Sequence, residues 1–338
     1  MEARRVNIKC LYDSQDISQD IAAFLKGFSI TEVLGGEADE AEISLHDREE
    51  LWIGDWLPEL GATMDITLQT TDWEGEGDTR ELPFGRFDVD EISLSGAPNE
   101  AKIKLISIPQ GEEGLNTVKK TRAWEKVKLS QIAKDVAVGA EVELYYDTEE
   151  DPVLERAEQS EQTDLSFLQK LCKDAGLSLK VSDGKIVIFD VSKYEKAEPV
   201  LEIVKGDAAL KSFECRQTVH EIYKACHVKY KHSKKDEFIE YTFTDPNREK
   251  GQTLEINEKV ESVEEAEKLA KKKLHEKNLE EVSVSLTMLG NFALLSSNTV
   301  TLKGFHNFDG KYIIKKSSHD VGSGYTTKVD LRRVIDGY

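Results

Sequence analysis

The chain has 338 residues, of which 39% are hydrophobic and 33% are charged. This length is enough for two or three domains with cores of their own, and the composition is that of a globular protein. It contains no run of about 18 apolar residues, so no membrane-spanning helix is expected. The first residues also lack the apolar stretch of a signal peptide, and we therefore expect a product that remains in the cytoplasm.

The net charge of −20 is unevenly distributed along the chain. Residues 1–115 carry −17, residues 116–200 carry −4, and residues 201–338 carry +1. Binding to nucleic acid without sequence preference requires a basic surface, so this charge distribution excludes that function class. The acidic third is interpreted either as a solvated face or as a surface that contacts a more basic partner.

The first 110 residues predict a β-rich region. Alternation of apolar and polar residues indicates strands over 6–12, 28–33, 42–45, 64–68, 85–94 and 101–108. One helix is expected near residues 17–25, where the apolar residues follow a helical stripe. Short strands separated by Gly, Pro and Asp are typical of a barrel or a sandwich.

The middle of the chain changes from a strand pattern to a helical one. Residues 129–136 predict one helix, and Thr163 can cap a second helix that ends at Gly176. After that helix, Asp183-Gly184 stands between two short apolar runs, which is a strong signal for a hairpin. These elements predict a small α/β module.

The last third returns to strands. They are expected over 221–232, 238–243, 282–289 and 299–302. Ser262 and Glu265 form a capping box that opens a helix ending near Leu279. The chain closes with a hairpin of two strands, 312–319 and 325–333, joined by a tight turn at 322–324 in which glycine can take a positive φ.

The cysteines and histidines predict neither disulfides nor a metal site. No CxxC pair exists, and we interpret as reduced thiols Cys10, Cys172, Cys215 and Cys226. One further group contains residue types that bind zinc: His220, Cys226, His227 and His232. Its spacing is not a standard zinc pattern, and on a strand about 20 Å would separate His220 from Cys226.

Three segments share a recognisable pattern with one protein family. Residues 85–92 read G-R-F-D-V-D-E-I, residues 158–168 read E-Q-S-E-Q-T-D-L-S-F-L, and residues 310–327 open with G-K-Y-I-I and close with G-Y-T-T. In this order they resemble the phage late control protein D family. The matching positions, to which we assign structural roles, are Gly85, Phe87, Asp90, Gln159, Ser160, Thr163, Asp164, Phe167, Leu168, Gly310, Tyr312, His319, Gly324, Tyr325 and Thr327.

The resemblance implies a baseplate hub of a contractile tail, similar in architecture to the N-terminal part of type VI secretion spike (VgrG) proteins. It implies a homotrimer that joins the hexameric tail tube to a central trimeric spike and contacts other baseplate proteins, without a specific nucleic-acid partner. Assembly in the bacterial cytoplasm into a virion or tailocin tail would follow. The fold class expected is α+β, mainly β, with tube-protein-like β-barrel domains at 1–112 and 201–338 flanking an α/β insert module at 113–200.

Local chemistry gives these motif residues structural reasons to be present. The Thr163 hydroxyl can cap free N–H groups of the helix that it precedes, and the Asp164 carboxylate favours the positive end of the helix dipole. Phe167 and Leu168 are expected to pack on the hairpin that follows. His319 is interpreted as a histidine that is hydrogen-bonded at a strand end rather than as a pH-sensitive contact.

Two alternative functions remain open. A tail-associated peptidoglycan hydrolase would need paired carboxylates, and Asp88 and Asp90 are expected on one face of a strand, about 6.6 Å apart. The serines lie outside any G-x-S-x-G context. A carbohydrate-binding β-module would need an aromatic platform, for which the candidates are Trp52, Trp56 and Trp73. We predict neither catalytic residues, nor a cofactor, nor a bound metal.

Overall fold

The computed structural model describes residues 3–110, 114–231 and 238–335. The fold is mainly β with few helices, as predicted. The first third of the chain forms β1 (Arg5–Tyr12), β2 (Gln15–Asp16), α1 (Ser18–Phe24), β3 (Leu25–Val33), β4 (Glu40–His46), β5 (Thr63–Thr71), β6 (Thr79–Ser95) and β7 (Glu100–Ile106). The predicted helix near residues 17–25 is therefore confirmed as α1.

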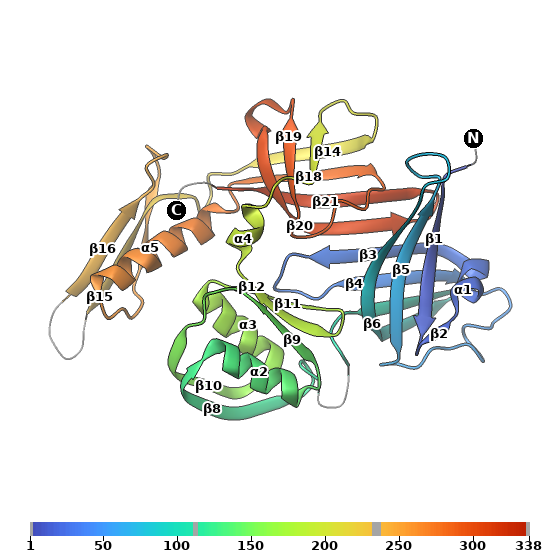
Figure 1. The fold of residues 1–338 in the computed structure, drawn as a ribbon, viewed down its shortest axis with the longest axis horizontal. Coiled ribbons are helices and arrows are strands. Elements are labelled where there is room, and N and C mark those ends of the chain that lie inside the picture. The colour runs from blue at the N-terminus through green and yellow to red at the C-terminus, as the bar shows by residue number, and fades with distance from the viewer. Residues whose placement is uncertain (1–2, 111–113, 232–237, 336–338) are drawn as a thin grey trace.

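The middle third forms an α/β module that packs beside the first third (Figure 1). Its elements are β8 (Lys119–Lys128), α2 (Leu129–Gly139), β9 (Glu143–Asp147), β10 (Val153–Thr163), α3 (Asp164–Ala175), β11 (Ser178–Ser182), β12 (Lys185–Phe189) and α4 (Val191–Glu195). The hairpin predicted at Asp183-Gly184 is confirmed: both residues have positive φ and join β11 to β12. Helices α2 and α3 pack with this hairpin in a common apolar core.

The last third contains the longest helix. Its elements are β13 (Leu201–Val204), β14 (Leu210–Gln217), β15 (Tyr223–Lys231), β16 (Phe238–Thr244), β17 (Gln252–Ile256), α5 (Val263–Asn278), β18 (Val282–Leu289), β19 (Thr299–Lys303), the 3-10 turn η1 (His306–Phe308), β20 (Gly310–Val321) and β21 (Tyr325–Arg333). Ser262 caps α5 by accepting a hydrogen bond from the Glu265 N–H at 3.1 Å, as predicted.

Strands from both ends of the chain join in one sheet. Its order is β14-β18-β21-β20-β3-β4-β7-β6-β5-β1-β2; β19 also pairs with β20, and β13 pairs with β19. The two ends meet where β20 pairs antiparallel with β3. Two closed barrels were expected, but the hydrogen-bonded path stays open from β14 to β2 within the described residues. The first and last thirds do not close separately, because β3 of the first third pairs with β20 of the last third and joins the two sheets.

A small lobe projects from the body of the molecule (Figure 1). Strands β16, β15 and β17 form its sheet, and α5 covers one face of that sheet. The core between them is built from Cys226, Val228, Ala266, Ala270 and Leu274. Within the residues that the structure describes, no helix combines the length and the apolar character that a membrane span requires.

Candidate functional site

Eight strands of the large sheet form an unbroken antiparallel run, β14-β18-β21-β20-β3-β4-β7-β6. The last third of the chain supplies the first four strands of this run, and the first third supplies the other four. The two ends of the sequence therefore contribute equal numbers of strands to one continuous surface (Figure 1).

One face of this run, here called the polar face, carries hydrophilic side chains from strand to strand. The register aligns one row across six strands: Thr326, Asp320, Ser29, Glu42, Lys104 and Glu91. Neighbouring charges compensate one another, since Lys104 lies 2.8 Å from Glu91 and Lys102 lies 3.3 Å from Glu42. Two hollows of about 390 and 300 Å³ open on this face. Such a face suits contact with water or polar partners.

The opposite face of the run is apolar and covered. In the first third, β1 and β5 pack Ile8 and Met64 against Ile30, Ile43 and Ile103. In the last third, β13 and β19 cover the inward side chains of β18 and β21 in a second core. The eight-stranded run is thus a sheet with an apolar core on one face and a hydrophilic surface on the other.

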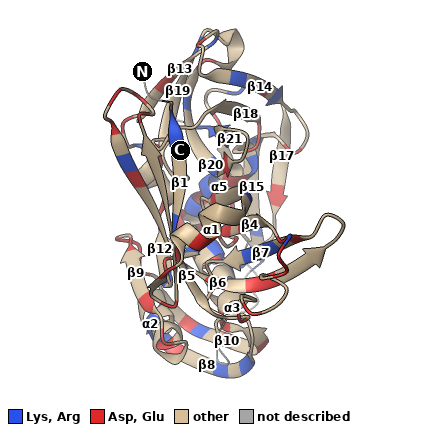
Figure 2. Cartoon of the chain, turned by 90° about the vertical axis from the view of Figure 1, so that its right-hand side faces the viewer, with Lys and Arg blue, Asp and Glu red and all other residues tan. Residues whose placement is uncertain are grey.

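Charges of both signs are mixed along the first third of the chain. Figure 2 shows acidic residues on α1 and basic residues on β7, which are Asp20 on the helix and Lys102 and Lys104 on the strand. The acidic excess of the first third is therefore interrupted by lysines. This arrangement provides no continuous basic track along the side shown.

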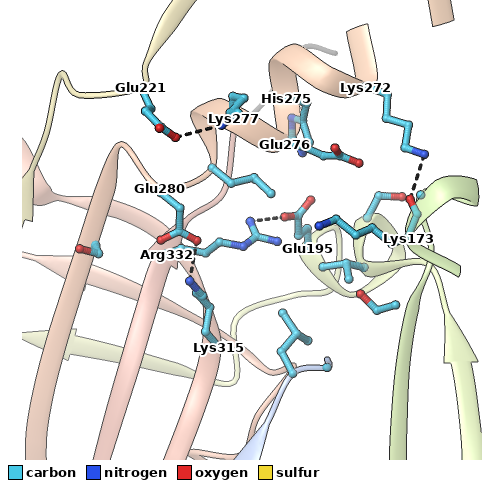
Figure 3. Close-up of a pocket in the computed structure, with 18 of the residues that line it drawn as sticks. Lys173, Glu195, Glu221, Lys272, His275, Glu276, Lys277, Glu280, Lys315 and Arg332 are labelled. Atoms are coloured by element: carbon cyan, nitrogen blue, oxygen red, sulfur yellow. Dashed lines mark hydrogen bonds and ion pairs between the residues drawn. The ribbon is translucent and has the colours of Figure 1, made fainter. Parts of the chain in front are cut away.

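A groove of about 900 Å³ lies between α3 and α4 of the insert module and α5 and β21 of the last third. Figure 3 shows that its labelled charged side chains point toward one another across the groove. Arg332 and Glu195 form a buried ion pair at 2.5 Å, and Lys315 lies 2.5 Å from Glu280. Lys272 donates to the carbonyl of Lys173 at 3.2 Å, at the C-terminal end of α3.

These contacts make the groove a junction between the insert module and the last third. Both side chains of its ion pair, Arg332 and Glu195, are buried. Burial lowers the pKa of His275 below its usual range, so its imidazole is neutral near pH 7. The Arg332–Glu195 ion pair and the Lys272 hydrogen bond connect the insert module to the last third.

The second motif builds a buried ion cluster. Asp164 is 1% exposed, and its carboxylate accepts hydrogen bonds from Lys120 at 3.0 Å, from Gln159 at 2.8 Å and from Arg122. Gln159 in turn accepts from Arg122 at 2.8 Å. We predicted only an interaction with the helix dipole for Asp164, and the pattern did not reveal its basic partners on β8.

The other residues of that motif surround this cluster. Thr163 caps α3 by accepting from the Ser166 N–H, as predicted, whereas Ser160 is exposed. Phe167 stacks on Trp124 of β8 with ring centroids 5.4 Å apart, and Leu168 is fully buried in the core of the module. The motif thus fixes α3 to both sheets of the insert.

The third motif forms a buried polar network. His319 is fully buried, and its Nδ1 lies 2.6 Å from the Tyr325 hydroxyl and 3.3 Å from the Thr327 hydroxyl. Its Nε2 lies 3.3 Å from the Ser317 hydroxyl, which donates to the carbonyl of Leu294. Burial lowers the pKa of His319 to about 4, so the ring is neutral at physiological pH. The ring is enclosed between β20 and β21. This histidine therefore fills space in the core and provides hydrogen-bond partners for the buried hydroxyl groups around it.

The glycines of the third motif behave differently from one another. Gly310 has φ of +136° at the start of β20, next to the fully buried Tyr312. At the turn before Tyr325, neither Gly322 nor Gly324 takes a positive φ, so that part of the hairpin prediction was wrong. The Gly322 N–H instead donates to the carbonyl of Gly324 at 2.9 Å, which closes a bend with ordinary backbone angles.

The first motif joins β6 to the insert module. Gly85 has φ of +80°, and an added Cβ would lie 2.5 Å from the Asp183 carboxylate of the β11–β12 hairpin. The N–H of Arg86 donates to that same carboxylate at 3.1 Å. Phe87 is buried in the core of the first third. Glycine is therefore required here by a close approach that the strand pattern alone does not reveal.

The paired carboxylates expected on β6 do not share a face. A β-bulge between Val89 and Glu91 interrupts the alternation at Asp90. Asp88 is therefore buried, where it accepts from the Gln110 N–H at 2.8 Å, while Asp90 is exposed. The expectation of one face was wrong, and this pair cannot act together on a glycosidic bond.

The three candidate tryptophans do not form a common platform. Trp52 is buried and meets Trp56 nearly edge-on, with an interplanar angle of 86°. Trp73 belongs to a different contact, where it donates to the carbonyl of Gly290 at 2.7 Å and packs on Tyr325. A flat sugar-stacking surface requires parallel exposed rings, and this arrangement lacks it.

All four cysteines are free thiols, as predicted. Burial raises the pKa of Cys10 and Cys172 to about 12, so these thiols are unreactive. Among the described residues no group of three or more His, Cys, Asp or Glu is arranged to hold a metal ion. His232 lies outside the described residues, and the absence of a metal therefore stays a prediction.

Residues 114–325 match the model of the phage tail baseplate hub (GPD) family. The chain belongs to that family. The matched region of this hub chain contains the ion cluster around Asp164 and, except for Thr327, the network around His319. The first motif, at Gly85, lies before the matched residues.

Two curated hub proteins are similar in sequence. The probable baseplate hub protein of Escherichia phage P2 is 26% identical over 202 residues, which are 58% of this chain and 49% of that protein. The corresponding protein of Escherichia phage 186 is 26% identical over 178 residues, covering 52% and 43% of the two chains. The hub chain thus spans about half the length of the curated relatives that it matches.

Solved structures share its fold over nearly the whole chain. The 43 kDa tail protein of prophage MuSo2 from Shewanella oneidensis has a TM-score of 0.75 at 14% identity, covering 97% of this chain and 98% of that one. A tail protein from Neisseria meningitidis MC58 has a TM-score of 0.73 at 13% identity, covering 97% and 96%. The E. coli c3393 protein, described as a component of the type VI secretion system, has a TM-score of 0.59 at 12% identity, covering 100% and 77%.

Proposed function

We propose that this hub chain is a structural, non-enzymatic component of a contractile phage or phage-like tail, and that it works as a trimeric adaptor. In this role it joins the hexameric tail tube to the central trimeric spike and contacts other baseplate proteins. Membership of the baseplate hub family supports the location in the tail. The adaptor role rests on one observation: the first and last thirds each supply four strands to the eight-stranded run.

The strand count supports a match between threefold and sixfold symmetry. Three copies arranged around one axis would place six groups of four strands in a ring. Such a ring is threefold by subunit, which suits a trimeric spike, and approximately sixfold by strand group, which suits a hexameric tube. In this arrangement residues 1–112 and 201–338 serve as two tube-like domains, and residues 113–200 form the insert module outside them.

The polar face is proposed to line the channel of this ring. Its hydroxyl groups and its compensated charges, such as Lys104 with Glu91, would present a hydrated surface to whatever passes along the axis. The apolar face is already covered within the chain by β1, β5, β13 and β19. The ring is proposed to assemble in the bacterial cytoplasm and to become part of a virion or tailocin.

The oligomeric state of the purified chain tests the adaptor role. Native mass spectrometry and light scattering over a range of protein concentrations should report a species of three chains in equilibrium with monomer. A chain that stays monomeric at the highest soluble concentration, or that forms a stable dimer, would contradict the trimer.

The alternatives of a peptidoglycan hydrolase and a carbohydrate-binding module gain no support from the described geometry. Asp88 and Asp90 are separated by a bulge, and Trp52 and Trp56 meet edge-on. Zymography on purified peptidoglycan gives a direct check. The proposed hub leaves the cell wall intact, and a cleared band that is absent from a mock preparation would contradict it.

A further inference from the structure

Two edges of the eight-stranded run lack a neighbouring strand within the described chain. β14 pairs on one side only, with β18. β6 pairs with β5 as far as Asp88, so residues 91–95 pair on one side only, with β7. Unpaired edges expose N–H and C=O groups that can bind another strand. We propose, building on the trimer above, that β14 of one copy pairs with residues 91–95 of the next copy.

The strand directions suit this pairing. Seven antiparallel steps lead from β14 to β6, so the two edge strands run in opposite directions. A rotation about an axis along the strands preserves those directions. Placing β14 beside the next copy's β6 would therefore continue the antiparallel order without interruption.

The backbone of β14 points its free groups outward at alternate residues. The Thr218 N–H donates to the carbonyl of Glu281 at 2.9 Å, so the backbone of Thr218 faces β18. Backbone direction alternates along an antiparallel strand. The N–H and C=O groups of Phe213 and Cys215 therefore face away from β18, toward the open side.

The same alternation fixes the outward residues of β6. The Ser107 N–H donates to the carbonyl of Asp39 at 2.9 Å, so the backbone groups of Ser107 face β4. Because backbone direction alternates along the strand, the backbone groups of Lys104 face the other neighbour, β6. Lys104 is the partner of Glu91 in the register. Glu91 thus faces β7, and the backbones of Ile92 and Leu94 face the open side.

The side chains on these outward residues form an incomplete apolar layer. Phe213 is 44% exposed and lies opposite Leu286 on the apolar face, while Leu94 is 40% exposed and lies opposite Ala101 on the same face. Each is uncovered on the side where a neighbouring strand would be. Pairing Phe213 with Leu94 covers both, and their shared face and backbone direction permit this register.

This register also aligns charge. In an antiparallel pair, residue numbers rise along one strand as they fall along the other. With Phe213 opposite Leu94, Cys215 is therefore opposite Ile92 and Arg216 is opposite Glu91. Arg216 and Glu91 both lie on the polar face, because Arg216 pairs with Ser283 and Glu91 pairs with Lys104 in their own sheets. An arginine and a glutamate directly opposite each other stabilise a pair of strands.

A single substitution tests the contact, because Cys215 is already present and partly exposed. In the proposed register, Ile92→Cys would place two thiols on directly opposite residues, with Cα atoms about 5.5 Å apart, within the range that a disulfide spans. Under a mild oxidant, we expect the variant to run as a covalent trimer on a non-reducing gel. The reduced variant should keep the circular dichroism spectrum and the Tm of the parent protein.

Two variants control for register. Ile92→Cys combined with Cys215→Ser should lose the cross-link completely. Leu94→Cys should cross-link at least tenfold more slowly, because it lies diagonal to Cys215 at about 7–8 Å, beyond easy disulfide reach. Equal cross-linking of Ile92→Cys and Leu94→Cys would overturn the register.

A charge exchange provides a second readout that does not depend on a cysteine. Arg216→Glu should weaken the trimer at least fivefold in dissociation constant, and adding Glu91→Arg should restore most of that loss. If the parent chain is trimeric but neither cross-linking nor charge exchange responds, the edge contact is wrong and the proposed function stands. A parent chain that is monomeric throughout contradicts both.

Discussion

At the scale of single residues, the buried carboxylate of Asp164 shows how much a motif position can depend on remote partners. It lies between Lys120, Arg122 and Gln159, and so its charge is compensated inside the insert module. The helix-dipole interpretation identified the right position but not the strongest interaction. Opposite charges within hydrogen-bond distance outweigh the dipole, which contributes roughly 0.3–1 kcal/mol at an exposed helix end.

Arg122→Ala should destabilise the insert module by roughly 3 kcal/mol, since it removes one partner of a buried ion pair. The remaining Lys120 compensates only part of the Asp164 charge. Denaturant unfolding followed by the fluorescence of Trp124, which packs beside this cluster, is the appropriate measurement. Arg156→Ala is the matched control, because the exposed pair of Arg156 with Glu158 should contribute less than about 0.5 kcal/mol. Equal losses in the two variants would contradict a special role for Arg122.

The buried carboxyl group of Glu32 should make the folding stability of the chain depend on pH. Burial raises its pKa to about 7, although Lys180 partly opposes the shift. Because the folded chain binds this proton more tightly than the unfolded chain, the Glu32 contribution to stability increases as pH falls from about 7 toward the ordinary range of a carboxyl group. Burial shifts the pKa of His319 down to about 4, so its contribution has the opposite sign and is lost as pH falls from about 6.5 to 4.

Glu32→Gln should therefore raise Tm at pH 8 and change it little at pH 5. Measuring the thermal unfolding of parent and variant at both values checks this expectation. Glu37→Gln, at an exposed position a few residues away, should show the same small difference at both pH values. A gain from Glu32→Gln that is independent of pH would refute the assignment of this titration to Glu32.

At the scale of elements, local signals were sufficient where the physics is local. Thr163 and Ser262 cap their helices as predicted, and Asp183-Gly184 makes the predicted turn. Longer-range features were not predictable, because alternation shows which face a strand buries but not which strand it pairs with. The pairing of β20 with β3 and the bulge at Asp90 both belong to this class.

The missed strand β14 has its own physical explanation. Its residues are nearly all exposed, so the alternation of buried and exposed positions that identifies most strands is weak there. If a neighbouring copy completes this strand, as we propose, the missing pattern reflects a partner outside the chain. The polar face was missed for a related reason, since it becomes one surface only when strands from both ends of the sequence are aligned.

Gly85 links two elements, and its substitution should separate them. Gly85→Ala should cost roughly 1–3 kcal/mol, because the left-handed backbone is strained for alanine and the new Cβ would collide with Asp183. Gly139→Ala is the matched control: Gly139 ends α2 with open space around it, and alanine there should be neutral or stabilising by up to about 1 kcal/mol. Urea unfolding midpoints compare the two, and a loss of similar size at both positions would contradict the contact.

At the scale of the whole molecule, the central claim is that one chain supplies two equal groups of four strands to a ring. Family membership places the chain in a tail baseplate, and the sheet topology supports the adaptor geometry. In the groove, the ion pair of Arg332 with Glu195 holds the insert module against the last third. No chemistry is required of the chain in this account.

Electron cryomicroscopy of the intact tail tests this claim most directly. The reconstruction should show three copies of the chain in one ring between tube and spike, with the polar face toward the axis and β14 of each copy beside β6 of the next. Six copies in the ring, or three copies placed away from the tail axis, would contradict the account.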